Sequence, residues 1–286
     1  MKSVLITGCS SGFGLEAAVL LARHGFRVFA SMRDLGKRGR LDAALAKAGV
    51  TAEILALDVT DAASIGAAVD HVVAAAGRID ALVNNAGFGI GGFVEDLTLD
   101  DYRRQFETNF FGLVAVTKAV LPHMRRARSG RIVNISSIGG RTANAGLSAY
   151  TASKHAVEGF SESLAFEAAL FNVQLVLIEP GTFKTEIFEA NRQLAAGAHD
   201  SASPYFEVTG ALETKIDELY ARMAADPRQV ADAILRALTT PRPRLRYLVG
   251  AEARMTMALH TLSFRLYAAI VRRALGLNAA LAAKLR

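Results

Sequence analysis

A short glycine-rich stretch near the start of the chain constrains the fold more than any other feature. The sequence TGCSSGFG (residues 7–14) directly follows the apolar run SVLI and directly precedes LEAAVLLARHG, which has a helical pattern. A strand that turns this sharply into a helix leaves the first N–H groups of the helix unpaired, and these groups together with the helix dipole attract an anion. The stretch therefore predicts a phosphate-binding turn between a strand and a helix.

The rest of the chain alternates short β-rich runs with longer Ala- and Leu-rich helical patterns. Near-continuous apolar strands that alternate with helices predict a parallel sheet covered on both faces. With 286 residues, 51% of them hydrophobic, the chain can bury a core within one domain. We expect an α/β fold, a single Rossmann-type doubly wound domain whose ligands bind beyond the carboxyl ends of the strands. The expected strands are residues 3–7, 27–32, 52–59, 79–84, 130–136, 173–180 and 245–250.

The N-terminal sequence and the single cysteine bear on location and redox chemistry. MKSVLITG enters a strand without the features of a secretory signal, so we expect a cytoplasmic protein. The lone Cys9 cannot form an internal disulfide, and its place among the glycines indicates a small side chain rather than a redox group. The six His residues show no metal-ligand spacing, so we expect no metal site.

Positive charge is concentrated at the end of the chain. The formal net charge is +6, and residues 242–286 alone hold nine Lys or Arg residues against the single acid Glu252. A basic tail on a near-neutral body favours an anionic surface or an acidic partner. Neither a nucleic-acid motif nor an interleaving of aromatic and basic residues accompanies it, so we expect no nucleic-acid partner.

The three glycines have distinct expected roles. Gly8 permits the tight turn, Gly12 lets the backbone approach a pyrophosphate, and Gly14 allows the helix to pack closely on the sheet. An ordinary strand-to-helix turn can share this spacing, but the position directly after the first strand favours a dinucleotide.

The residue after the second strand indicates which dinucleotide binds. Folds that bind NAD carry an acid at this point, whereas here the strand is followed by Arg33. A guanidinium pairs with the 2′-phosphate of NADP(H), which an acid would repel. We expect NADP(H), and Asp34 leaves NAD(H) open. Asp58, which ends the third strand, either contacts the adenine or caps the next helix with Thr60 and Asp61.

A second group of polar residues indicates catalysis. SAYTASKHAVEGF places Tyr150 and Lys154 four residues apart in a helical pattern, on one helix face. Ser136 and Ser137 end the strand before them, and Asn109 in ETNFFG adds a polar side chain in apolar surroundings. Taken alone, the Tyr–Lys pair also fits a surface helix. Together with the glycine turn and the serine, it favours an active site.

These residue types suit the reduction of a carbonyl group by hydride. Such a reaction needs an acid to protonate the developing alkoxide, and lowering the pKa of a tyrosine from near 10 to about 7 takes roughly 4 kcal/mol. A neighbouring ammonium in a partly desolvated site supplies energy of that order. We therefore expect Tyr150 to be the acid, Lys154 to lower its pKa, and Ser137 to donate a hydrogen bond to the substrate oxygen.

The ordered motifs resemble the short-chain dehydrogenase/reductase family. They are TGCSSGFG, NNAG, Asn109, Ser137, YTASK and PGTFKT, and the similarity reaches from the start of the chain to about Gly250. The resemblance implies an NADP(H)-binding catalytic domain over residues 1–250. It also implies that Tyr150 is the catalytic acid/base, that Lys154 binds the nicotinamide ribose, and that Asn109 holds a water in a proton relay.

The resemblance further implies the cofactor contacts and the assembly. Asn84–Gly87 is expected to support the central sheet and line the cofactor, with Thr185 on the nicotinamide side. Family members commonly pair through the helices that carry the Asn and Tyr motifs, so we expect a homodimer or homotetramer. The expected cofactor-binding residues are Gly8, Ser10, Ser11, Gly12, Phe13, Gly14, Arg33, Asp58, Val59, Asn85, Ala86, Gly87, Tyr150, Lys154, Pro180, Gly181 and Thr185.

Within the family, LITGCSSGFG, SMRDLGKRGRL and RPRLRYLVG are similar to the branch that contains 17β-hydroxysteroid and retinol dehydrogenases. That similarity implies oxidation or reduction of one hydroxyl or carbonyl on an apolar steroid-, retinoid- or lipid-like substrate. GFGIGGF (residues 87–93) and the apolar residues of a lid at about 183–225 either contact this substrate or only pack the lid. The lid residues in question are Phe183, Ile187, Phe188, Tyr205 and Phe206.

Two alternatives differ from this interpretation in substrate or in class. One is a 3-oxoacyl thioester reductase, whose acidic carrier would meet Lys184 and Arg192. The other is a non-catalytic NADP(H)-binding regulatory protein. Against the second, the Ser137, Tyr150 and Lys154 set is intact, and binding alone does not need a positioned acid.

Residues 251–286 are expected to form a basic amphipathic helical extension. Leu259, Leu262, Leu266 and Ile270 fall on one face of a continuous helix, and charges interrupt it too often for a membrane span. Such a helix covers the substrate entrance, lies on an anionic membrane as a peripheral contact, or packs on a partner or on its own domain.

Overall fold

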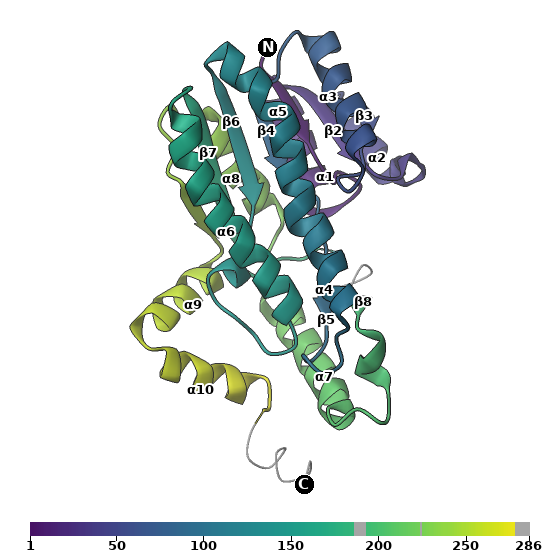
Figure 1. The fold of residues 1–286 in the computed structure, drawn as a ribbon, viewed down its shortest axis with the longest axis vertical. Helices are drawn as coiled ribbons and strands as arrows, with labels where there is room; N and C mark the ends of the chain where they lie inside the picture. The colour runs from purple at the N-terminus through teal and green to yellow at the C-terminus, as the bar shows by residue number, and fades with distance from the viewer. Residues whose placement is uncertain (186–192, 224, 278–286) are drawn as a thin grey trace.

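The central element of the molecule is a parallel β-sheet (Figure 1). A computed structural model describes residues 1–185, 193–223 and 225–277. Seven strands lie in the order β3-β2-β1-β4-β6-β7-β9, and each expected run contributes one of them. The order reverses between β1 and β4, which places a ligand crevice at their carboxyl ends. The strands are β1 (Ser3–Ile6), β2 (Arg27–Met32), β3 (Glu53–Ala56), β4 (Ala81–Asn84), β6 (Gly130–Ile135), β7 (Val173–Pro180) and β9 (Arg246–Val249).

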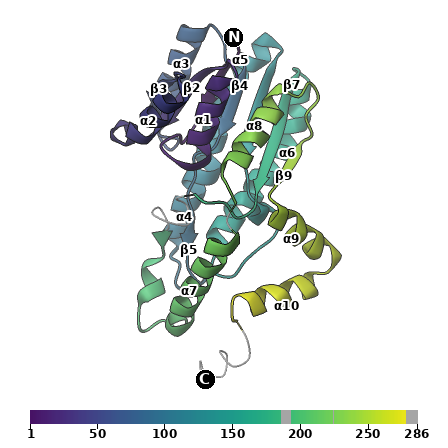
Figure 2. The same cartoon turned by 180° about the vertical axis from the view of Figure 1, so that it is seen from behind.

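Helices cover both faces of this sheet. One layer consists of α1 (Gly12–Arg23), α2 (Gly39–Ala48) and α8 (Arg228–Thr239), as Figure 2 shows. The opposite layer consists of α3 (Ala62–Ala76), α5 (Leu113–Ala127) and α6 (Ser148–Ala169) (Figure 1). The predicted doubly wound α/β fold is therefore confirmed.

Smaller elements gather beyond the carboxyl edge of the sheet. Strands β5 (Ile90–Gly91) and β8 (Gln193–Leu194) form a separate parallel pair that the sequence patterns did not predict. Helix α4 (Leu99–Phe106) leads through the π-helical turn η2 (Glu107–Gly112) into α5. Helix α7 (Phe206–Met223) and the 3₁₀ turns η1 (Leu35–Lys37), η3 (Ile138–Gly140) and η5 (Ala196–His199) also lie on this side.

A chain of buried hydrogen bonds joins the middle of the sheet to the helices above it. Asn84 Nδ2 donates to Asn134 Oδ1 and to Thr117 Oγ1, each at 2.9 Å. Asn134 Nδ2 in turn donates to Ser161 Oγ at 2.8 Å. Since buried amides are costly unless they are paired, these bonds favour one position of α5 and α6 on β4 and β6.

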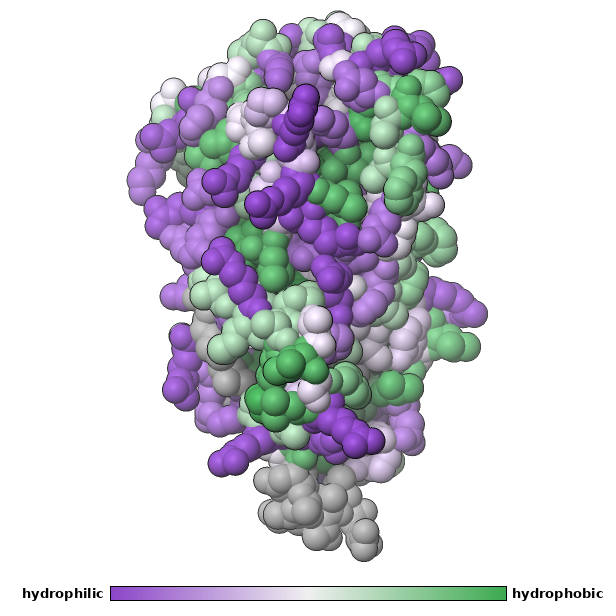
Figure 3. All heavy atoms as spheres, turned by 90° about the vertical axis from the view of Figure 1, so that its left-hand side faces the viewer, coloured by the Kyte–Doolittle hydropathy of each residue, from purple (hydrophilic) through white to green (hydrophobic). Residues whose placement is uncertain are grey.

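The C-terminal extension folds as two helices, which corrects the expected single helix. Helix α9 (Ala251–Leu262) ends at Ser263, whose extended backbone starts α10 (Phe264–Ala274) and whose Oγ accepts a hydrogen bond from Leu266 N. The expected continuous apolar stripe is therefore divided. Figure 3 views the molecule from the side on which these helices lie. In the described part of the chain, no helix has the length and apolar character needed to span a bilayer.

The core is formed by residues on alternate faces of the strands. Val4 and Ile6 of β1 face the layer of α1 and α8, whereas Leu5 between them faces the layer of α3 and α5.

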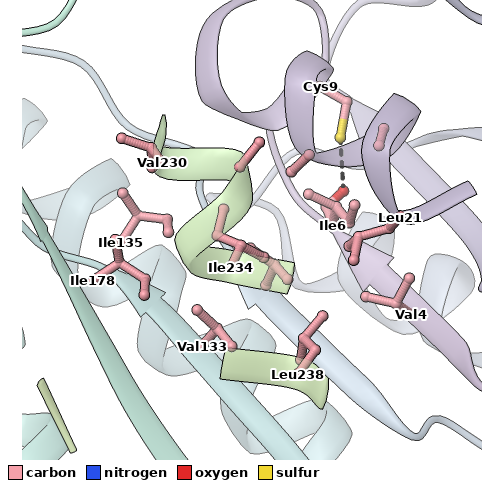
Figure 4. Packing of buried hydrophobic residues seen from close by; sticks show 14 of the residues in the cluster. Val4, Ile6, Cys9, Leu21, Val133, Ile135, Ile178, Val230, Ile234 and Leu238 are labelled. Carbon is pink, nitrogen blue, oxygen red and sulfur yellow. Dashed lines mark hydrogen bonds between the residues drawn. The ribbon is translucent and has the colours of Figure 1, made fainter. Parts of the chain in front are cut away.

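Cys9 is buried in the layer of α1 and α8, where its Sγ lies 3.4 Å from the Ile6 carbonyl oxygen (Figure 4). Burial raises the pKa of the Cys9 thiol to about 12. The thiol therefore stays protonated, which agrees with a structural role for Cys9.

Candidate active site

One large cavity runs along the carboxyl edge of the sheet. Its volume is about 1210 Å³, more than the roughly 300–1,000 Å³ typical of small-molecule pockets. It begins at the glycine-rich turn, passes Ser137 and Tyr150, and ends between α7 and the tail helices α9 and α10. The cavity is therefore large enough to hold a dinucleotide and a second molecule side by side.

Close backbone packing fixes the conformation of the glycine-rich turn. Gly8 has φ +73°, and a Cβ on Gly14 would lie 2.3 Å from the Gly8 carbonyl oxygen. Asn85 Nδ2 donates to the carbonyl oxygens of Thr7 and Gly8, both at 2.9 Å. Gly14 thus packs against the turn itself as well as lying at the start of α1, a more local role than the expected packing on the sheet.

The start of α1 meets the requirements of an anion site. Ser11 is the N-cap residue, its side chain forms no capping hydrogen bond, and the first turn of the helix contains no acid. The amide groups there face the part of the cavity lined by Ser10, Ser11 and Gly12. The residues present therefore fit a dinucleotide pyrophosphate.

The structure brings the expected cofactor-binding residues together. All of them line the cavity except Gly14, which shapes the turn from behind. The lining set comes from the segments after β1, β2, β3 and β4, the start of α1, helix α6, and the end of β7 with the segment after it. These distant parts of the sequence therefore meet at one edge of the sheet.

The residues after β2 separate into two groups. Arg33 and Lys37 line the cavity. Asp34 instead caps η1, because its Oδ1 accepts a hydrogen bond from Gly36 N at 2.9 Å. Strand β3 ends at Ala56, so Asp58 lies beyond the strand rather than closing it, and its Oδ1 accepts from Thr60 N and Thr60 Oγ1. Asp58 therefore both lines the cavity and caps a turn.

Three of the four expected catalytic residues meet in the middle of the cavity. Ser137 follows β6 and starts η3, where its Oγ accepts a hydrogen bond from Gly139 N at 3.0 Å. Tyr150 and Lys154 project from the first turns of α6, and all three side chains line the cavity. Lys154 Nζ donates to the Ile135 carbonyl oxygen at 2.8 Å and lies 5.9 Å from the centre of the Tyr150 ring.

The pKa of Tyr150 corrects one expectation. Burial raises this pKa above its ordinary value, and a hydrogen bond with the Ser137 side chain opposes the rise. Burial also lowers the pKa of Lys154 to about 8, because the ammonium loses water too. The expected depression of the Tyr150 pKa to about 7 is therefore absent in the protein alone. Tyr150 is protonated at neutral pH, the form that a general acid needs.

Asn109 lies deeper than the other three. Its Oδ1 accepts from Phe88 N, and its Nδ2 donates to the Phe88 carbonyl oxygen and to Ser153 Oγ. The side chain belongs to the π-helical turn η2 and is absent from the cavity lining. These bonds tie the segment after β4 to α6, so the side chain positions other residues. The water-holding role stays a prediction.

The far end of the cavity was only partly anticipated. Phe183 lines it, and so does every residue of 87–93 except Ile90. Tyr205 stacks on Phe93 with ring centres 4.5 Å apart, and neither Tyr205 nor Phe206 lines the cavity. Ile187, Phe188 and Arg192 are outside the described residues.

Two tyrosines that the sequence analysis missed help to form the far wall. Tyr220 of α7 lies with its hydroxyl 2.9 Å from the Phe183 carbonyl oxygen and accepts a hydrogen bond from Thr185 N. Tyr267 of α10 donates to the Ala143 carbonyl oxygen at 2.8 Å. The sequence gives little indication that these two tyrosines line the cavity, because each is a single aromatic residue in a helix.

Known proteins agree with this arrangement. A family model for short chain dehydrogenases matches residues 2–195, a segment that includes the glycine-rich turn and the Ser137, Tyr150 and Lys154 set. The chain belongs to the short-chain dehydrogenase/reductase family. It is accordingly an oxidoreductase of the class that acts on CH–OH groups, as the resemblance implied.

Relatives of this oxidoreductase include members of the expected branch. The chain is 41% identical to retinol dehydrogenase 8 of Bos taurus, covering 86% of this chain and 80% of that one. It is 38% identical to estradiol 17-beta-dehydrogenase 1 of Rattus norvegicus, covering 85% and 72%. It is also 38% identical to a 3-ketodihydrosphingosine reductase of Bacteroides thetaiotaomicron, covering 89% and 90%. The predicted similarity to the retinol and hydroxysteroid branch is confirmed.

Solved structures share the fold over most of the chain. A family member from Burkholderia phymatum in complex with NAD superposes with a TM-score of 0.80 at 26% identity, covering 93% of this chain and 94% of that one. A gluconate 5-dehydrogenase from Burkholderia cenocepacia in complex with NADP and tartrate gives 0.73 at 26% identity, covering 89% and 95%.

The close packing of the glycine-rich turn generates a first prediction. Gly14→Ala places a Cβ against the Gly8 carbonyl oxygen, so the turn must shift and dinucleotide affinity should fall by about tenfold or more, which is about 1.4 kcal/mol or more. Gly66→Ala is the matched control, because a Cβ there meets nothing within 4 Å. Fluorescence titration with NADPH and NADH measures both variants, and equal affinities in the two would contradict the prediction.

Proposed function

We propose that this chain is an NADP(H)-dependent oxidoreductase that interconverts a carbonyl and a primary or secondary alcohol on an apolar, lipid-, steroid- or retinoid-like substrate. The observation that carries the proposal is the continuity of the cavity. The same space joins the glycine-rich turn, the Ser137 and Tyr150 side chains, and walls formed by Leu212, Leu259 and other apolar residues of α7, α9 and α10. An apolar molecule bound against those walls has its reacting group beside Tyr150.

The side chains support the following division of labour. When bound, the nicotinamide supplies the hydride that reaches the carbonyl carbon. Tyr150, protonated at neutral pH, gives its proton to the carbonyl oxygen as the C=O π pair moves onto that oxygen. Ser137 offers a hydroxyl within the same part of the cavity to orient the oxygen. Lys154, held by the Ile135 carbonyl oxygen, places positive charge beside the developing phenolate.

Preference for NADP(H) is supported by the side chains after β2. Arg33 and Lys37 bring positive charge to the cavity, while the Asp34 carboxylate is bound to Gly36 N in η1. A phosphate on the adenosine ribose gains charge-assisted hydrogen bonds from a guanidinium in this position.

The substrate class is supported by the relatives as well as by the cavity. A ketosphingoid, a retinoid and a steroid, named for three of these relatives, all combine an apolar body with one oxygen function. Nothing in the described lid specifically favours a carrier-bound 3-oxoacyl thioester. Lys184 interacts electrostatically with Asp226 of its own chain, and Arg192 lies outside the described residues.

Assembly and location are further parts of the proposal. Phe111 of η2, Phe166 of α6 and Leu170 directly after α6 expose much of their apolar surface on the two elements that carry the Asn and Tyr motifs. This supports a homodimer or homotetramer, which sedimentation velocity can measure. A cytoplasmic location also stays a prediction.

The tail helices support peripheral contact with an anionic membrane. Leu262, Phe264 and Leu266 are exposed on α9 and α10, and hydrophobic and hydrophilic residues lie side by side on this face of the molecule (Figure 3). Arg265 and Arg272 are exposed on α10, which contains no acid. Helices of this length with basic and apolar surface lie in the plane of a bilayer. We propose that the occupant of this surface is an anionic lipid bilayer.

Turnover tests the core of the proposal. The intact protein should oxidise NADPH, faster than NADH, with ketosteroids, retinal or a long-chain ketone, and Tyr150→Phe should lower kcat by about 10²- to 10⁴-fold with NADPH affinity nearly unchanged. Initial rates and fluorescence titration measure the two quantities. Turnover only with carrier-bound 3-oxoacyl thioesters would favour that alternative, and NADPH binding without turnover on the whole panel would favour a regulatory protein.

The position of Arg33 predicts cofactor discrimination. Arg33→Asp should weaken NADPH binding by roughly 10- to 100-fold and NADH binding far less, because the guanidinium pairs only with the extra phosphate. Arg23→Asp is the control, since Arg23 is exposed at the end of α1 and absent from the cavity lining. An equal loss for both dinucleotides in the Arg33 variant shows that this residue does not meet the phosphate.

Vesicle binding tests the proposed membrane contact. The protein should sediment with vesicles of phosphatidylcholine and phosphatidylglycerol, and much less with phosphatidylcholine alone. Leu262→Asp should reduce that binding, whereas Leu99→Asp, an equally drastic change of an exposed leucine on α4, should not. Failure of the intact protein to bind anionic vesicles, or identical binding by both variants, overturns the assignment of this surface.

A further inference from the structure

A group of buried charges lies behind the catalytic lysine. Glu158 comes four residues after Lys154 in α6, and its side chain is 7% exposed. Glu179 of β7 is 2% exposed. Arg246 of β9 pairs with both carboxylates, since its Nε lies 3.0 Å from Glu158 Oε2 and 3.0 Å from Glu179 Oε1. Carboxylates this deep need counter-charge, and one guanidinium serves two of them.

Two more residues complete this carboxylate cluster. Arg246 Nη1 pairs with Glu162 Oε1 at 2.8 Å, and Arg141 Nη1 pairs with Glu179 Oε1 at 3.2 Å. The cluster thus holds three carboxylates, those of Glu158, Glu162 and Glu179, against the two guanidinium groups. With every member ionised, it carries one negative charge in excess.

Helix geometry places the Glu158 side chain next to Lys154. Residues four apart in a helix lie on the same face, so Glu158 sits one turn behind Lys154. A Cβ on Gly140 would lie 3.0 Å from the Lys154 carbonyl oxygen, 3.0 Å from Glu158 Cγ and 2.8 Å from Ser136 Oγ, so the three groups crowd around one point. Within the described structure, Glu158 Oε1 is buried without a hydrogen-bond partner. Its charge is therefore only partly compensated by direct contacts.

The ammonium group of Lys154 is the positive charge that offsets the excess negative charge of the carboxylate cluster. Its ammonium group is buried, and the hydrogen bond to the Ile135 carbonyl oxygen brings no negative charge with it. Burial lowers the pKa of Lys154 to about 8, and Glu158 opposes that fall. The ammonium form exists below that pKa, so losing the Glu158 charge moves the upper limit of the charged form to lower pH.

We propose that Glu158 is a positioning residue for the reaction, because the excess negative charge of the carboxylate cluster keeps Lys154 in its ammonium form beside Tyr150. Only the kinetic consequence of this role for Glu158 rests on the proposed function. Arg246 from β9 pairs with Glu158, with Glu162 from α6 and with Glu179 from β7, and Arg141 from the segment after η3 pairs with Glu179. The titratable group beside Lys154 on its other side is Tyr150, whose ring centre lies 5.9 Å from Lys154 Nζ. Removal of a carboxylate and removal of a guanidinium should therefore have opposite effects on Lys154.

The direct test is a titration of Lys154 that does not depend on turnover. Protein labelled with ¹³C at the lysine Cε is followed by NMR against pH, with the Lys154 signal assigned from Lys154→Arg. Glu158→Gln should lower the titration midpoint by about one pH unit, and Arg141→Gln should raise it. Glu167→Gln, the same substitution at an exposed site on α6, should leave it in place.

Kinetics add a second readout if the proposed function holds. The alkaline fall of kcat with NADPH should move to lower pH in Glu158→Gln, and Glu158→Asp should restore it toward the wild-type position. Circular dichroism checks that the variants fold. If Glu158→Gln does not fold, the inference is decided by whether Arg141→Gln raises the titration midpoint of Lys154. An unmoved midpoint in the folded Glu158→Gln variant, or shifts of the same sign in Glu158→Gln and Arg141→Gln, overturns the inference. Absence of turnover in the intact protein overturns the proposed function instead and leaves the NMR result standing.

Discussion

The place of Tyr150 relative to Ser137 depends on buried hydrogen bonds between amides in the middle of the sheet. Asn84 and Asn134 are neighbours on β4 and β6, and their side chains reach Thr117 of α5 and Ser161 of α6. Unpaired amides at this depth would each cost on the order of 1–3 kcal/mol, so a slip of either helix is strongly disfavoured. Because α6 is fixed in this way, its first turns meet the end of β6, and Tyr150 comes to lie beside Ser137.

The sheet and the glycine-rich end of the cavity were predictable because they follow local rules. Apolar runs gave the seven strands, since buried parallel strands need no polar face. The glycine-rich turn and Arg33 could be placed because both directly follow a strand, and carboxyl ends share one edge of the sheet. The placement of Lys154 and Tyr150 on one helix face could likewise be predicted from their helical spacing.

The remaining features depend on tertiary contacts that spacing does not encode. The pKa of Tyr150 and the pKa of Lys154 each respond to the burial of that side chain, which spacing along the sequence does not reveal. The break at Ser263 divided a helix that periodicity treats as continuous, although a serine before a helical run is a recognisable N-cap. The β5-β8 pair joins two-residue strands from distant segments, too short for any alternating pattern.

The place of the far cavity wall in the sequence bears on how the cavity can change in evolution. The matched family segment stops at residue 195, whereas α7, α9 and α10 come later in the chain. The Ser137, Tyr150 and Lys154 set and the cavity wall formed by α7, α9 and α10 are therefore encoded in largely separate stretches. Contacts such as the one from Tyr267 to the Ala143 carbonyl oxygen join them. Substitutions in the later stretch can reshape this wall while leaving the Ser137, Tyr150 and Lys154 set and the glycine-rich turn untouched.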